Sequence, residues 1–148
     1  QRTHDIYTKT GDRLERTWTI CHTGLVRHTM PHLLICSKSK RISDDQTLAS
    51  YLRMYEIDLA SFGSPIADDF ADKFAIFLTP KDIPIASRLL TPEFQAMLSI
   101  NFSNYDFELD GQDIYIYGYD QPLELVKLDR QLRGLVWLAE TIRQAKLA

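Results

Sequence analysis

The sequence predicts a single α+β domain: a mostly antiparallel sheet of about seven strands, two short central helices, and a long C-terminal helix packed on one face. The first supporting observation is the segment 105–117, where apolar and polar residues alternate around Asp110-Gly111, as in a β-hairpin. The second is the segment 122–146, where apolar residues recur at helical spacing. The third is a pair of prolines, Pro84 and Pro92, each suited to the first turn of a short helix.

The N-terminal half is predicted to be mostly strands. Residues 6–9 and 14–22 form a hairpin around a short polar turn, and residues 31–36 form a continuous apolar strand that is covered on both faces. We expect these three strands to form one antiparallel meander. Two further strands are predicted at 54–59 and 74–78.

The helices are predicted from local signals. The segments 83–89 and 92–99 form two short helices, and the hydroxyl of Thr91 caps the second. A single helical turn is expected at 68–71. The C-terminal helix, 122–146, carries an apolar stripe that covers the sheet or seals a partner: Leu125, Leu128, Leu132, Leu135, Ala139 and Ile142.

The hairpin turn predicts which residues share a face of the sheet. A two-residue loop at Asp110-Gly111 pairs Leu109 with Gln112, Phe107 with Ile114 and Tyr105 with Ile116. The opposite face is expected to be wet, and it carries Asp106, Glu108, Asp113, Tyr115 and Tyr117. In this register Glu108 lies opposite Asp113, and either a looser pairing or a cationic partner relieves the repulsion.

Composition limits the class of protein. The chain has 148 residues, enough for one domain, and a net charge of -3, which disfavours nucleic acid as a partner. Cys21 and Cys36 are too far apart in the predicted pairing for a disulfide, which favours a reducing compartment and hence the cytoplasmic side. The chain contains no apolar stretch long enough to span a membrane and begins at Gln1, so we expect a soluble piece of a longer protein.

Motifs for metal binding and catalysis are weak. His28, His32 and Cys36 follow one another at intervals of four residues. On a strand, His28 and Cys36 would be about 26 Å apart, too far to bind the same ion. Asp106, Glu108, Asp110 and Gly111 match the start of a calcium-binding loop, but Tyr117 stands where the loop needs its last carboxylate ligand. Serines lack a nucleophile-elbow context. We therefore expect no metal, no cofactor and no catalytic residue, and a chain that is not an enzyme.

The most specific candidate site is a partner-binding surface. Tyr115, Tyr117 and Tyr119 project from one face of the last strand, with Asp106 and Glu108 beside them. Rigid amphipathic aromatic side chains of this kind are common anchors at protein interfaces. The alternative is that the terminal helix or the first strands cover these side chains.

Six segments resemble an uncharacterised family of bacterial predicted membrane proteins. Family members read approximately as a PHI strand, an LEGxFxKYF segment, a TPEVM helix start and a YDIEIxxDxLYLY hairpin. The matching segments here are 30–38 (MPHLLICSK), 55–59 (YEIDL), 69–74 (DFADKF), 90–94 (LTPEF), 105–109 (YDFEL) and 114–117 (IYIY). Residues 59–62 depart from the glycine-containing turn of the family, and 63–67 form an insertion.

The resemblance implies a soluble α+β domain attached to transmembrane helices that lie outside this sequence. The expected role is a non-enzymatic protein-interaction or structural module of a membrane-anchored bacterial protein, with a protein as its unknown partner. The alternative is a small-molecule-binding or enzymatic domain with a pocket between the sheet and the C-terminal helix, where His32, Tyr105 or Trp137 converge. A third possibility is self-association through the terminal helix.

Overall fold

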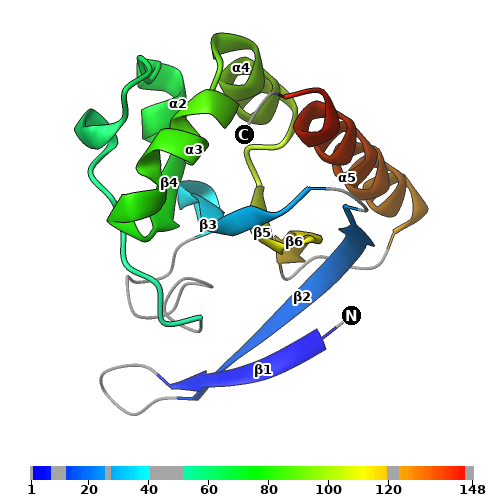
Figure 1. Cartoon of the computed structure of the whole chain (residues 1–148). Coiled ribbons are helices and arrows are strands. Elements are labelled where there is room, and N and C mark those ends of the chain that lie inside the picture. The colour runs from blue at the N-terminus through cyan, green and yellow to red at the C-terminus, as the bar shows by residue number, and fades with distance from the viewer. Residues whose placement is uncertain (1, 8–12, 26–27, 41–51, 120–123, 146–148) are drawn as a thin grey trace.

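The structure, a computed structural model, describes residues 2–7, 13–25, 28–40, 52–119 and 124–145 (Figure 1). It has the predicted α+β fold. The strands are β1 (Arg2–Tyr7), β2 (Arg13–Gly24), β3 (Met30–Ser37), β4 (Phe74–Leu78), β5 (Tyr105–Gly111) and β6 (Asp113–Tyr119). The α-helices are α2 (Asp68–Lys73), α3 (Ile83–Leu89), α4 (Pro92–Asn101) and α5 (Leu125–Gln144).

The strands form one six-stranded sheet in the order β1-β2-β6-β5-β3-β4, and every pairing is antiparallel. The predicted hairpin of β1 and β2 is confirmed, with residues 8–12 outside the described part. The predicted meander is wrong, because β2 pairs with β6 and β3 lies between β5 and β4. An apolar strand such as β3 is most stable with neighbours on both sides, and the C-terminal hairpin supplies one of them.

The β5–β6 hairpin has a different register from the predicted one. The loop is Gly111-Gln112, and Gly111 has the positive φ, 60°, that such a turn requires. Leu109 therefore pairs with Ile114, and Glu108 lies opposite Tyr115 rather than Asp113. The shift is two residues, so every side chain stays on its predicted face.

The predicted strand at 54–59 is wrong. Only Glu56 forms an isolated bridge, with Phe77, and the amide of Ile57 donates to the carbonyl of Ile76 at 2.8 Å. The carboxylate of Asp58 then accepts from the amide of Ala60 at 3.0 Å and starts a 3₁₀ turn, Leu59–Ser61. A side chain that caps a turn in this way ends the extended backbone.

The local helix signals were reliable. Helix α3 has the predicted bounds, and α4 continues two residues beyond its predicted end. The Thr91 hydroxyl accepts from the amide of Phe94 at 3.2 Å, which confirms the cap. Helix α2 contains the predicted turn and continues to Lys73.

The C-terminal helix is confirmed, but part of its predicted stripe is wrong. Leu125 and Leu132 are exposed, and the face that meets the sheet consists of Gln131, Gly134, Leu135, Leu138, Ala139 and Ile142. Gln131 is buried because its side-chain amide donates to the carbonyls of Thr19 and Ile116, at 2.7 and 2.8 Å. Residues 122, 123 and 146 of the predicted helix lie outside the described part.

The four α-helices of the described residues cover the same face of the sheet. Figure 1 shows α5 beside β2 and β6, with α2, α3 and α4 grouped toward β3 and β4. Between helices and sheet lies one apolar cluster that includes Phe70, Phe74, Leu98 and Phe107. We call this side of the sheet the helical face.

Candidate functional site

The second face of the sheet carries the polar residues that the sequence indicated. We call it the ladder face, and its members are Ile20, His22, His32, Leu34, Cys36, Ala75, Phe77, Asp106, Glu108, Tyr115 and Tyr117. Asp106, Glu108, Tyr115 and Tyr117 lie on one face, as predicted, because β5 and β6 pair without a bulge. The side chain of Tyr119 lies outside the described part.

Glu108 is the centre of the network on this face. Nε2 of His32 donates to its Oε2 at 2.6 Å, and the Tyr117 hydroxyl donates to its Oε1 at 2.5 Å. Three neighbouring strands, β3, β5 and β6, therefore supply one hydrogen-bonded group. Donors to both carboxylate oxygens offset the cost of burying the charge.

Asp106 has a separate set of partners on the same strand. Its Oδ1 accepts from the backbone amide of Ser37 at 2.7 Å, and its Oδ2 accepts from the Cys36 thiol at 3.3 Å. Asp106 thus ties β5 to the end of β3. Its role in this conformation is structural.

The predicted exposure of this face is wrong over much of its area. Asp106, Glu108 and Tyr117 are only 1%, 5% and 8% exposed, so these three side chains offer little surface to a partner. The cause is a small apolar cluster on the ladder face, against which Leu52 and Met54 pack. The terminal helix is not the cover, because α5 lies on the helical face.

An exposed group of side chains remains on the ladder face, where β2 ends and β6 begins. Nε2 of His22 donates to Oδ1 of Asp113 at 2.8 Å, and both side chains are about half exposed, at 48% and 49%. The His22 ring stacks on Tyr115 with centroids 4.6 Å apart, and Tyr115 stacks on Tyr117 at 6.2 Å. We call His22, Asp113 and Tyr115 the rim.

The rim is acidic where the hairpin turns. Asp110 lies directly opposite Asp113, and Asp110 is exposed. This pair takes the place of the predicted Glu108–Asp113 pair. Carboxylates that face each other across strands destabilise the sheet unless a cation lies nearby, and His22 is the neighbour that can supply one.

Neither cysteine forms a disulfide, as predicted. Cys36 lies on the ladder face and Cys21 on the helical face, where burial raises the pKa of its thiol. A thiol with a raised pKa is a poor nucleophile at neutral pH.

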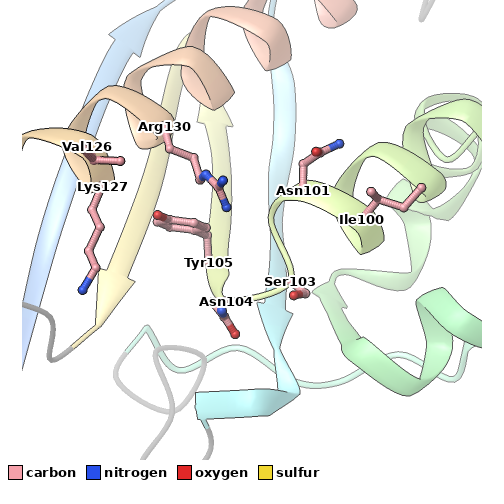
Figure 2. A pocket seen from close by; sticks show the side chains of 8 residues that line it. All are labelled: Ile100, Asn101, Ser103, Asn104, Tyr105, Val126, Lys127 and Arg130. Carbon is pink, nitrogen blue, oxygen red and sulfur yellow. The ribbon is translucent and has the colours of Figure 1, made fainter.

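A pocket opens between α5 and the loop that joins α4 to β5 (Figure 2). Tyr105, one of the three residues that the sequence indicated for a small-molecule pocket, lines it. His32 and Trp137 do not converge there, because His32 lies on the ladder face and Trp137 stacks on Phe94 and Phe102. Lys127 and Arg130, which also line the pocket, had no distinguishing pattern in the sequence.

The described residues form neither a metal-binding cluster nor a membrane-spanning helix. Within these residues, no three His, Cys, Asp or Glu side chains gather in a way that could hold a metal ion. None of the described helices has the length and hydropathy that crossing a bilayer requires.

Comparisons with protein-family models, curated proteins and solved structures found no match to this chain. The resemblance to a family of bacterial predicted membrane proteins therefore stays a prediction.

Proposed function

We propose that this chain is a non-enzymatic interaction module of a membrane-anchored bacterial protein, and that it contacts its partner through the rim. The observation that carries the proposal is the half-exposed His22–Asp113 pair stacked on Tyr115. Aromatic side chains held rigidly in this way lose little conformational entropy on binding.

The buried part of the ladder face supports the rim. Tyr115 stacks on Tyr117, whose hydroxyl is bound to Glu108, and Glu108 is in turn bound to His32. This connected network fixes the orientation of the rim aromatics before a partner arrives. Glu108 thus acts from behind the contact surface.

The charge of the rim favours a cationic partner segment. Asp110 and Asp113 face each other at the hairpin turn, beside the stacked rings of His22 and Tyr115. An arginine side chain can pair with carboxylates and stack on aromatic rings at the same time. We therefore propose a polypeptide that presents an arginine to the rim.

The membrane attachment and the cytoplasmic side belong to the same proposal. The membrane attachment is supported by the family resemblance, and the cytoplasmic side by two cysteines that do not pair with each other. Segments outside this sequence would supply the anchor.

A pull-down from native membranes tests the interaction. The bait is the domain, compared with a His22→Ser/Tyr115→Ser variant and with a Leu132→Ser/Val136→Ser control on the exposed side of α5. We expect a partner that the wild type and the control capture and the rim variant loses. All three baits are first checked by circular dichroism, and a folded rim variant that keeps the partner would contradict the proposal.

A second candidate function, small-molecule binding, is favoured by the pocket beneath α5 in Figure 2. It lies between the C-terminal helix and the loop that joins α4 to β5, and Tyr105 is the residue it shares with the pocket expected from the sequence. This function does not exclude the first, because the pocket opens beside α5 and the rim lies on the opposite face of the sheet.

Self-association through α5 has one specific observation in its favour. Leu132 and Val136, one helical turn apart, are both exposed and border a shallow hollow with Trp137. Sedimentation equilibrium tests it: a mass that rises with concentration in the wild type, and not in Leu132→Ser/Val136→Ser, would support this reading.

A further inference from the structure

The pocket in Figure 2 has a volume of about 250 Å³ and is lined by residues from two separate parts of the chain. The end of α4 and the following loop form one wall, and the first two turns of α5 form the other. The lining residues are Ile100, Asn101, Ser103, Asn104, Tyr105, Val126, Lys127 and Arg130.

The charge of this lining is positive. Among the described residues, the lining contains Lys127 and Arg130 and no carboxylate, although the chain as a whole carries a net charge of -3. Nζ of Lys127 lies 3.8 Å from the carboxylate of Glu124, which is exposed and outside the lining. Cations gathered in a concave site focus the electrostatic potential and attract anions.

Arg130 differs from Arg133, the next arginine of α5, in its ion pairing. Arg133 donates through Nε to Asp129 at 2.8 Å, but Arg130 makes no ion pair with any carboxylate in the described ranges. Figure 2 shows its guanidinium extending from α5 into the space beside Tyr105. Within the described part of the chain, its planar set of donors is therefore not taken up by a carboxylate.

The opposite wall is held in place. The Ser37 hydroxyl donates to the carbonyl of Ser103, and the Ser39 hydroxyl donates to Oδ1 of Asn104 at 3.0 Å. Because the oxygen of the Asn104 amide faces Ser39, its NH₂ group is left as a donor at the pocket wall. Asn101 instead turns back along α4, where its amide contacts Sδ of Met97 at 3.1 Å.

From these observations we infer that the pocket binds the phosphate group of a small phosphomonoester. Arg130 supplies a bidentate fork, Lys127 a second positive charge and Asn104 a neutral donor. A phosphomonoester carries close to two negative charges at neutral pH, and two cations balance that charge. A carboxylate ligand carries a single negative charge and would need only one cation.

The volume of the pocket and the residues at its mouth limit what the rest of the ligand can be. The volume lies below the range of about 300–1,000 Å³ that is usual for drug-sized ligands, so the group inside it is small. Ile100 and Val126 line the pocket and are 75% and 78% exposed, so an aliphatic part of the ligand can contact them at the mouth. The same phosphate chemistry occurs in a soluble ester and in a phosphatidic acid headgroup.

This inference names the ligand class of the second candidate function and is independent of the rim. The test titrates the domain with glycerol 3-phosphate, with glycerol as the neutral match, and with vesicles that contain or lack phosphatidic acid. The probes are compared for the wild type, Arg130→Gln and a charge-matched control, Arg133→Gln. Circular dichroism confirms that each variant folds.

We expect the wild type and Arg133→Gln to bind the phosphate probe, and Arg130→Gln to bind at least about tenfold more weakly. Binding to glycerol 3-phosphate identifies a soluble ester as the source, and binding to phosphatidic acid vesicles alone identifies a lipid headgroup; both support the inference. Equal binding of glycerol overturns it while leaving a small-molecule site. Unchanged binding by Arg130→Gln, or no binding of either phosphate probe, overturns it as well.

Discussion

The two faces of the central sheet are built from the same strands but held by different forces. The helical face joins the sheet to four helices through one apolar cluster. The ladder face has a smaller apolar cluster, and beside it two buried carboxylates with hydrogen bonds to β3 and β6. Apolar packing stabilises a face by excluding water, whereas a hydrogen-bonded network can continue to side chains that are in contact with water. The second arrangement lets a rigid sheet present the rim to solvent.

The largest expected effect is the loss of a core aromatic from the helical face. Phe107 is almost fully buried, so Phe107→Ala is expected to lower the free energy of unfolding by about 3–5 kcal/mol. His22→Ala, at the exposed rim, is expected to cost less than about 1 kcal/mol. Urea denaturation measures both, and similar costs for the two variants would break the proposed division between the faces.

A matched pair of carboxylates sharpens the comparison within the ladder face. Glu108 and Asp113 each accept a hydrogen bond from a histidine, at 2.6 and 2.8 Å, but only Glu108 is buried. Glu108→Ala is expected to destabilise the domain by about 2–3 kcal/mol, because it removes the acceptor of the buried Tyr117 hydroxyl and of the partly buried His32 ring.

The exposed partner is the control. Asp113→Ala is expected to cost less than about 1 kcal/mol, since water replaces the lost contact. The same urea titration compares the two variants. If Asp113→Ala proved as costly as Glu108→Ala, the rim would be part of the core rather than a surface open to a partner.

Close packing of α5 on the helical face predicts an unusual result at Gly134. Glycine to alanine normally stabilises a helix interior, but a Cβ here would lie 2.8 Å from Cε1 of Phe102 and 3.3 Å from Cδ1 of Ile116. Gly134→Ala is therefore expected to destabilise the domain by about 1–3 kcal/mol.

Gly63 provides the matched substitution. A Cβ at this position meets nothing within 4 Å, so Gly63→Ala is expected to change stability by less than about 0.5 kcal/mol. Thermal unfolding ranks the two variants. A stabilising Gly134→Ala would show that α5 lies farther from Phe102 and Ile116 than this packing requires.

The smallest expected effect is the pH dependence that Cys21 contributes. Burial raises the pKa of this thiol above its ordinary value of 9.0, so above that pH the unfolded chain loses the proton first. The unfolded state then binds fewer protons than the folded state, and stability falls as the pH rises. Wild type is expected to lose more unfolding free energy than Cys21→Ala between about pH 8 and pH 10. Parallel pH profiles would contradict the burial of the thiol.

What the sequence predicted depended on how local the signal was. The bounds of α3 and the start of α4 follow from Pro84, Thr91 and Pro92, which act on their own backbone. The faces of the β5–β6 hairpin were predicted for the same reason, because alternation survives a register shift of two residues.

What the sequence did not predict requires contacts between distant segments. His32 and Glu108 are 76 positions apart, and their hydrogen bond exists because β3 lies beside β5 and not β2. Of the rim residues, Asp113 and Tyr115 were predicted to lie on the wet face, and the alternation in β2, which places His22 on the face of Ile20, is the signal that could have indicated the third. The basic pocket likewise depends on how α5 approaches the α4–β5 loop, which no periodicity encodes.

The most direct test of the rim as a contact surface is site-specific photo-crosslinking in cells that produce this protein. A benzophenone side chain is placed at position 115 on the rim, and in a parallel sample at position 136, which is exposed on α5. We expect one discrete crosslinked adduct from position 115, and we expect the Asp113→Lys substitution to abolish it. Position 136 is expected to give no adduct of equal intensity. An adduct from position 136 alone, or an adduct from position 115 that Asp113→Lys leaves unchanged, would contradict the rim as the partner surface.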